Sequence, residues 1–157
     1  MNQFVETTLC YLEKDGCYLM LHRNKKTNDI NHDLWIGLGG KLEKDETVEA
    51  CLLREIKEES GLTLSTFQLR GKITFKQDGF FEIIYLYTAN GFSGNLSDCD
   101  EGELCWVKFE DIKQLPLWEG DRIFLDLLIK QAPYFELELI YQQRKLVKAI
   151  LNNQVIK

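Results

Sequence analysis

Three of the glutamates in residues 40–62 have a spacing that lets them act together on one ligand. The stretch reads GKLEKDETVEACLLREIKEESGL. On a helix, with about 100° between residues, Glu55 and Glu59 continue an apolar stripe and Glu58 lies on the flank of the same face. Crowded carboxylates repel one another unless a cation lies among them, and hard oxygen ligands favour Mg²⁺ or Mn²⁺. The spacing therefore predicts a divalent metal site, which could bind a polyphosphate and activate water.

The helix that carries these acids is expected over about residues 48–60. Thr47 is suited to the N-cap of this helix and Gly61 to its C-cap. An alternative interpretation is a solvated helix face on which the acids pair with Arg54 and Lys57. We favour the metal site, because an ordinary solvated face would not continue the apolar stripe.

The residues before this helix predict a hairpin and a loop that faces a ligand. The runs 4–12 and 17–22 are rich in β-forming residues and are joined by a turn at Asp15-Gly16. A polar loop over 23–34 leads into the glycine-rich stretch 35–40. Glycines at this density permit close approach of the backbone to a ligand.

The residues after the helix predict a sheet that is covered on both sides. The runs 67–76 and 80–90 are joined around Asp78-Gly79, and the second run is apolar on both faces. A polar loop over 91–102 ends in several acids, and a short strand is expected at 105–107.

The C-terminal part predicts a short helix or turn at 110–118, a helix at 121–130 and a strand at 135–141, while the run 146–151 could be strand or helix. Strands with helices between them indicate a mixed α/β or α+β sandwich, with helices on both sides of a central sheet. We expect residues 1–157 to form a single domain.

Composition excludes some classes of partner. The formal net charge is -6, with no block of Lys or Arg, which argues against binding to nucleic acid or to an anionic membrane surface. The five cysteines lack a CxxC pair, which is typical of reduced thiols in a cytosolic protein. No apolar stretch approaches the ~20 residues of a membrane span. We therefore expect a cytoplasmic protein, and the sequence predicts no particular oligomeric state.

The spacing of residues 40–62 resembles a known family signature. Gly40, five residues, Glu46, seven residues and then REIKEESGL match every fixed position of the Nudix box, the signature of the Nudix hydrolases. The resemblance implies an α/β/α sandwich with a mixed central sheet. It also implies roles for particular residues. Arg54 would orient a catalytic glutamate, and Glu46 would brace the loop against the helix. Glu55 or a neighbouring acid, such as Glu58, would activate the water, and the metal ligands would be Glu55, Glu58, Glu59 and the carbonyl group of Gly39.

Most of the chain also resembles the MutT-type branch of this family, which hydrolyses oxidised purine nucleoside triphosphates such as 8-oxo-dGTP to the monophosphate and pyrophosphate. The similar stretches are 35–42, 100–106 and 117–121. The resemblance implies a Mg²⁺-dependent enzyme, with Mn²⁺ as an alternative, and a small-molecule nucleotide as substrate. Glu101 would be a further metal or water ligand, although its neighbour Glu103 is an alternative. The implied substrate-binding residues are Thr8, Arg23, Leu38, Gly39, Gly40, Lys41, Trp118 and Asp121.

Two positions depart from the MutT-type pattern. A member of that branch carries Asn at the position of Ile36 and a second pocket acid at the position of Gly120. These differences weaken the inference that the chain recognises an oxidised purine base, but they do not affect the predicted metal site. Trp118 could equally be a core or interface aromatic residue. The alternatives are a Nudix hydrolase of another nucleoside diphosphate-linked substrate, and a catalytically silent ligand-sensing domain on the same fold.

Overall fold

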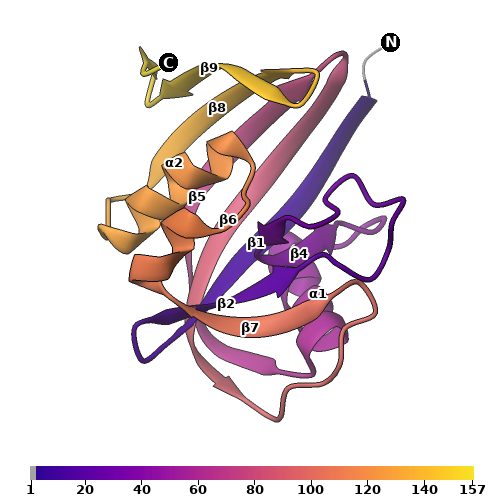
Figure 1. Ribbon diagram of the computed structural model, residues 1–157. Coiled ribbons are helices and arrows are strands. Elements are labelled where there is room, and N and C mark those ends of the chain that lie inside the picture. The colour runs from indigo at the N-terminus through magenta and orange to yellow at the C-terminus, as the bar shows by residue number, and fades with distance from the viewer. Residues whose placement is uncertain (1–2) are drawn as a thin grey trace.

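The computed structural model describes residues 3–157 (Figure 1). In chain order the elements are β1 (Gln3–Lys14), β2 (Cys17–His22), β3 (Trp35–Ile36), β4 (Leu38–Lys41), α1 (Val48–Ser60), β5 (Thr63–Gln77), β6 (Phe80–Ser93), β7 (Glu103–Lys108), a 3₁₀-helix (Phe109–Gln114), α2 (Glu119–Ile129), β8 (Phe135–Gln142), β9 (Lys145–Leu151) and β10 (Gln154–Val155).

A mixed sheet forms the centre of the fold. Its strands follow the order β10-β9-β8-β5-β6-β1, and β4 pairs with the other side of β1. β5 and β6 form the antiparallel hairpin predicted around Asp78-Gly79, where φ values of 46° and 86° supply the left-handed turn. β1 runs parallel to β6, and β8 runs parallel to β5. The predicted mixed central sheet is therefore confirmed.

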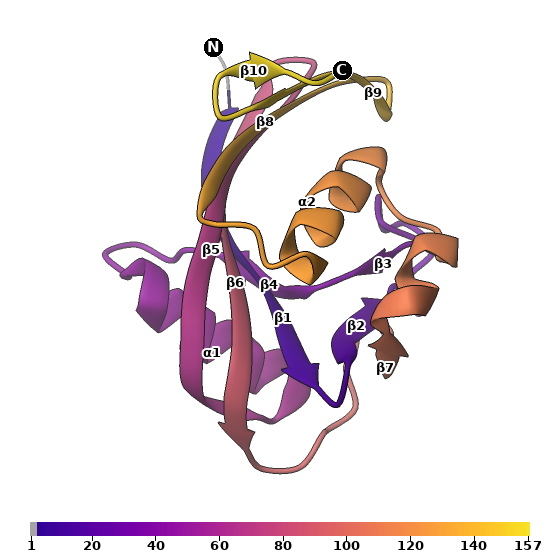
Figure 2. The ribbon, with the colours of Figure 1, turned by 90° about the vertical axis from the view of Figure 1, so that its left-hand side faces the viewer.

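The first hairpin is shorter than the sequence suggested. Its turn lies at Asp15-Gly16 as expected, but only Glu13 with Tyr18 and Lys14 with Cys17 are paired between β1 and β2. Beyond these pairs β1 continues along β6, while β2 pairs with β7 and β3 in a separate layer on the α2 side (Figure 2). The two strands separate because each has a longer partner elsewhere.

The two α-helices cover opposite faces of the central sheet (Figure 2). α1 buries Leu52 and Ile56 in one apolar cluster, and α2 buries Phe124 and Leu128 in a second cluster on the other face. Both faces of the sheet are therefore shielded, as the apolar residues on both sides of β6 predicted. The expected α/β/α arrangement is confirmed.

Several predicted elements change their bounds or type. The bounds predicted for the helix, 48–60, are those of α1. The Thr47 hydroxyl accepts a hydrogen bond from the Ala50 N–H at 3.1 Å, and Gly61 ends the helix with a φ of 79°. The glycine-rich stretch 35–40 forms two short strands rather than a loop, because its extended backbone pairs with β1 and β2. The run 146–151 is a strand, and α2 begins at Glu119, two residues before the prediction.

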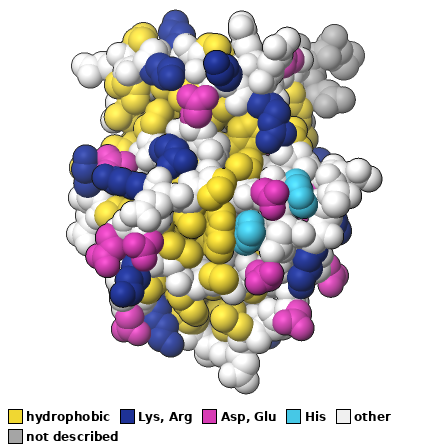
Figure 3. Space-filling view, in the orientation of Figure 1, with side chains coloured by type: hydrophobic (Ala, Val, Ile, Leu, Met, Phe, Trp, Pro, Cys, Tyr) yellow, Lys and Arg dark blue, Asp and Glu magenta, His cyan; other side chains and the backbone are white. Residues whose placement is uncertain are grey.

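The surface on the side shown in Figure 3 carries interspersed charges of both signs around a central band of hydrophobic side chains. Among residues 3–157, no helix has the length and apolar character needed to cross a bilayer.

Candidate active site

The acids of α1 face the short strand β4 at very close range. The N–H of Gly39 donates a 2.7 Å hydrogen bond to Oε1 of Glu59. At Gly40, an added Cβ would lie only 2.4 Å from the carboxyl carbon of Glu55. A larger residue at position 40 would therefore displace this carboxylate from its present position. The glycine-rich stretch therefore brings backbone against the acids of the helix, as its composition predicted.

Arg54 ties the N-terminal loop of α1 to these acids. Its guanidinium group forms a bidentate pair with Glu46 at 2.7 and 2.9 Å, and its Nη1 lies 2.9 Å from Oε1 of Glu55 and 3.4 Å from Oε2 of Glu58. The hydrogen bonds from Arg54 and from the N–H of Glu43 lower the pKa of Glu46 to about 2. Glu46 therefore remains ionised and holds Arg54 in a fixed orientation beside Glu55.

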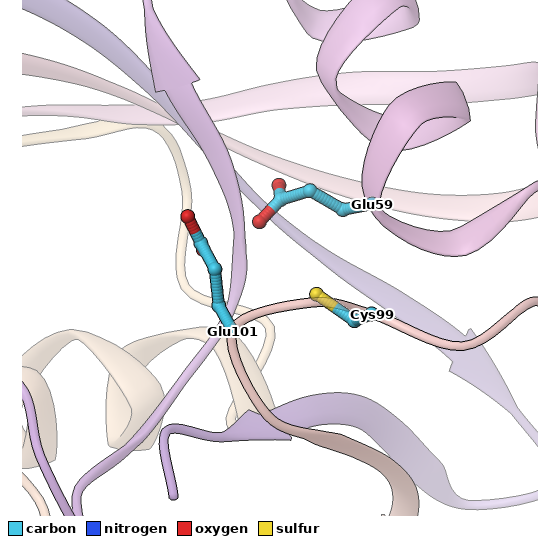
Figure 4. Close-up of side chains that lie close together, drawn as sticks. All are labelled: Glu59, Cys99 and Glu101. Carbon is cyan, nitrogen blue, oxygen red and sulfur yellow. The ribbon is translucent and has the colours of Figure 1, made fainter. Parts of the chain in front are cut away.

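A second loop brings further ligand atoms to the far end of α1. Glu59, Cys99 and Glu101 place a carboxylate oxygen, a thiol sulfur and another carboxylate oxygen within 4.8 Å of one another (Figure 4). Glu59 projects from the last turn of α1, while Cys99 and Glu101 come from the loop before β7. Glu103 instead accepts a hydrogen bond from Asn24 at 2.8 Å, so of the two candidate acids only Glu101 faces Glu59.

The electrostatics of this group fit a bound cation. Burial and the charges of Glu101 and Glu55 raise the pKa of Glu59 to about 8, although the hydrogen bond from the Gly39 N–H and the charge of Arg23 act in the opposite direction. Such a site is stabilised when a cation replaces the proton on the buried carboxyl group. Glu58 has 59% of its side chain exposed and can reach a cation from the solvent side. The oxygen-rich donor set could hold divalent cations together with the carbonyl of Gly39.

Arg23 lies at the edge of this site and is already paired. Its guanidinium group contacts Glu101 at 2.8 Å and Asp29 at 2.5 Å. A contact from Arg23 to a phosphate would therefore have to share or replace one of these ion pairs. Leu38 is fully buried, whereas Lys41 at the end of β4 is exposed, and its charge offsets part of the increase that burial causes in the pKa of Glu82.

Trp118 and Asp121 lie on the α2 side of the sheet. The indole Nε1 of Trp118 donates to Oδ1 of Asn31 at 2.7 Å, its ring meets Tyr141 edge-on at 5.5 Å, and the guanidinium group of Arg144 lies 4.7 Å from its centre. The ring is half-buried, so both interpretations of Trp118, packing and base stacking, are compatible with this environment. Asp121 lies in the first turn of α2, deep in the fold but partly accessible, and burial raises its pKa to about 8.

The structure does not bring Thr8 together with Asp121. The Thr8 hydroxyl lies 3.6 Å from the Cys51 sulfur, beneath α1, on the opposite face of the sheet from α2. Side chains alternate between the two faces of a strand, so the neighbour Thr7 faces α2 instead, where its hydroxyl donates to Glu82. Thr8 therefore lies on the face opposite Asp121, whereas Thr7, one residue earlier in the strand, lies on the same side of the sheet as Asp121.

Sequence reasoning missed three residues that the structure places at these sites: Thr7, Glu82 and Cys99. Glu82 had a detectable signal, since it is a charged residue within the otherwise apolar run 80–87. Cys99 had none, because a lone cysteine two residues before an acid has no metal-ligand spacing of its own. The departure at Gly120 also has a physical reason. An added Cβ there would lie 2.5 Å from Leu139 Cδ1 and 2.8 Å from the Tyr141 hydroxyl, so an acidic side chain at this position would have to displace both neighbours.

The family of the chain follows from comparison with known proteins. The sequence model of the family described as "NUDIX domain" matches residues 5–128, which include the whole of α1 and the loop of Glu101. The chain belongs to the Nudix hydrolase family. It is similar to the Nudix hydrolase YvcI of Bacillus subtilis (strain 168), with 32% identity over 136 residues that cover 83% of this chain and 82% of YvcI.

Two further relatives support the MutT-type resemblance. The oxidized purine nucleoside triphosphate hydrolase of Danio rerio is 31% identical over 102 residues, which cover 64% of this chain and 65% of that enzyme. The mutator MutT protein of Bacillus halodurans has the same fold, with a TM-score of 0.84 at 22% identity over 94% of this chain and 97% of that protein. The Nudix hydrolases generally use divalent metal ions, which agrees with the acids gathered around Glu59.

Proposed function

We propose that this Nudix hydrolase is a Mg²⁺-dependent nucleoside triphosphate pyrophosphohydrolase that acts on oxidised purine nucleotides such as 8-oxo-dGTP. The products would be the nucleoside monophosphate and pyrophosphate. The observation that carries the proposal is the convergence of Glu59, Glu101 and the carbonyl-bearing strand β4 around one point, with Glu55 and Glu58 on the same helix face. We take residues 1–157 as one domain in this proposal, since β8 to β10 continue the central sheet beyond the family match.

The residues have separate tasks in this reaction. When bound, divalent cations supply charge neutralisation for the polyphosphate and make an attacking water molecule more acidic. Glu59 and Glu101 would hold a cation at the less exposed end of the site, and Glu58 would reach it from the exposed end. Arg54 holds one oxygen of Glu55 at 2.9 Å, so the other oxygen is oriented to accept a proton from the water.

The oxidised purine as substrate is supported by separate observations. Asp121 offers a carboxyl group that can donate or accept a hydrogen bond to a base, because burial raises its pKa to about 8. Trp118 lies three residues earlier at the start of α2 and presents a partly exposed aromatic ring. The Danio rerio relative is named as an oxidized purine nucleoside triphosphate hydrolase.

A turnover screen tests the proposal. We expect Mg²⁺-dependent release of pyrophosphate, with kcat/KM higher for 8-oxo-dGTP than for dGTP, dinucleotides or nucleotide sugars. Glu59→Gln, Glu55→Gln and Glu58→Gln should each lower kcat by about 10² or more, since each removes a charged ligand or base. The matched control is Glu49→Gln, an exposed acid in the first turn of the same helix. Preference for a dinucleotide or a nucleotide sugar would reassign the substrate, and inactivity on every compound would favour the ligand-sensing alternative.

A further inference from the structure

Glu82 is an acid placed where the sheet is otherwise apolar. It lies on β6 between β1 and β5, on the face that α2 covers, and its neighbours along the strand are aromatic and branched aliphatic residues. The Thr7 hydroxyl donates a 2.8 Å hydrogen bond to its Oε2. A carboxylate has room for about four hydrogen bonds, and no other side chain of residues 3–157 donates to Glu82. A partly accessible acid with unused acceptor positions is poorly explained by packing alone.

Asp121 approaches the same region from α2. Its carboxyl group receives no hydrogen bond from the described part of the chain, although it is deeply set. The charge of Glu82 adds to burial in raising the pKa of Asp121, so the two carboxyl groups lie within electrostatic reach of each other. Packing also links the two positions. Phe75 lies opposite Glu82 in the β5–β6 ladder, and the centre of its ring lies 6.4 Å from that of Trp118, whose carbonyl accepts a hydrogen bond from the Asp121 N–H.

A third polar group lies on the same side of the sheet. The phenol oxygen of Tyr11 is completely buried, and no group among residues 3–157 has full hydrogen-bond geometry to it, although the N–H of Gly37 lies near enough to lower its pKa. The centre of the Tyr11 ring lies 6.2 Å from that of Phe124, which follows Asp121 by one turn of α2. Burial and then the charge of Asp121 raise the pKa of Tyr11, so the two side chains lie within electrostatic reach of each other. Glu82, Asp121 and Tyr11 therefore keep unused hydrogen-bonding capacity on the α2 side of the sheet.

We propose that Glu82 and Asp121 together bind the hydrogen-bonding edge of the nucleobase, with Glu82 as a specificity-determining residue of this enzyme. This inference rests on the proposed function, since it concerns the base of the same substrate. An oxopurine presents N–H donors next to a carbonyl acceptor. One carboxylate that accepts and one carboxyl group that donates match such an edge, whereas two ionised acids would not.

The electrostatics support this division of roles. Burial raises the pKa of Asp121 to about 8, so near neutral pH it is mainly protonated and can donate. Burial also raises the pKa of Glu82, and the hydrogen bond from Thr7 and the charge of Lys41 offset only part of this increase. Glu82 is assigned as the acceptor because it already accepts the hydrogen bond from the Thr7 hydroxyl. A side chain at position 120 would have to displace Leu139 and Tyr141, so the second acid of this region comes from β6 rather than from α2.

The experiment measures base recognition by binding, which does not depend on turnover. Isothermal titration calorimetry in buffer with EDTA would compare 8-oxo-dGMP, dGMP and deoxyribose 5-phosphate on the wild type, Glu82→Gln and Asp121→Asn. We expect the wild type to bind at least one purine monophosphate more tightly than the sugar phosphate. Each variant should weaken that binding by about 10- to 100-fold, the usual range for a lost hydrogen bond to a charged group. The affinity for the sugar phosphate should stay unchanged.

The matched control is Glu6→Gln. Glu6 is on β1 next to Thr7 but faces the α1 side, where it accepts a 2.6 Å hydrogen bond from Tyr85. Equal purine affinity of Glu82→Gln and the wild type would overturn the inference, as would a wild type that binds no purine monophosphate. Thr7→Val keeps the inference testable if Glu82→Gln does not fold, because it removes the one described donor to Glu82 and should weaken purine binding several-fold. Inactivity of the wild type on all triphosphates, together with Glu82-dependent purine binding, would refute only the proposed reaction.

Discussion

Replacing Asp121 with Asn should stabilise the fold, because the wild-type enzyme carries an acid where burial opposes ionisation. The pKa of Asp121 is raised by burial from an ordinary value of 3.8 to about 8. In the unfolded chain this acid ionises above pH 4, and in the folded chain it ionises only near pH 8. The folded state therefore binds the extra proton between these values. The contribution of Asp121 to the stability of the fold is therefore largest below pH 4, and it falls as the pH rises towards 8.

The size of the effect follows from the part of this pKa shift that lies below the working pH. Between the ordinary pKa of Asp121 and pH 7, the shift spans about 3 pKa units, and each unit corresponds to about 1.4 kcal/mol. Full burial of this acid would therefore lower the free energy of unfolding at pH 7 by roughly 4 kcal/mol. Part of the Asp121 side chain is accessible to solvent, which reduces the cost. We expect Asp121→Asn to be more stable than the wild type by about 1–3 kcal/mol at pH 7.5, and by much less at pH 4.5.

Urea unfolding with EDTA at pH 4.5, 6.0, 7.5 and 9.0 would measure this difference. Comparing the variant with the wild type at each pH removes the contribution of other raised acids, such as Glu59 and Glu82, which titrate in both proteins. The same substitution should weaken discrimination between oxidised and normal purines. A stability difference that does not change with pH would refute the assignment of Asp121 as a buried, mainly protonated acid.

Three further predictions concern the metal end of the site. Gly40→Ala should lower kcat by about 10² or more with a small change in melting temperature, because the new Cβ would displace the Glu55 carboxyl group; unchanged kinetics would contradict the contact. Arg54→Lys should lower kcat more than it raises KM, since a lysine cannot form the bidentate pair, and an effect on KM alone would argue against an orienting role. Glu101→Gln should weaken Mn²⁺ binding by about tenfold, measured by electron paramagnetic resonance, whereas Glu103→Gln should leave it unchanged. Weaker Mn²⁺ binding in Glu103→Gln alone would assign the ligand role to Glu103 instead.

The sequence predicted the metal end of the site far better than the base end. The acids of α1 lie within five consecutive residues of one helix, so helical geometry alone places them on one face once Thr47 and Gly61 fix its ends. The box also identifies Gly40, and the structure supplies the reason, which is the contact with Glu55. These relations are local, and they do not depend on how the strands pair.

The base end depends on pairing that the sequence does not specify. A difference of a single residue in a strand exchanges the α1 face for the α2 face, so the sequence alone did not show that Thr7 rather than Thr8 shares a face with Asp121. Glu82 reaches Thr7 only because β6 lies parallel to β1 with Val5 opposite Glu82. No residue spacing within one segment could have shown that neighbourhood.

Repulsion between neighbouring carboxyl groups is reduced differently at the two ends of the site. Each brings carboxyl groups close together in a partly buried place, where the ionised forms repel one another. At the metal end Arg54 offsets part of that repulsion, and a bound divalent cation would offset the rest and allow Glu55 and Glu58 to act as charged groups. On the α2 side no described cation pairs directly with Asp121, and burial favours its protonated form instead. A nucleobase edge needs both a donor and an acceptor. In the proposed base site, the proton on Asp121 would be the donor and Glu82 would be the acceptor, so no metal ion would be required.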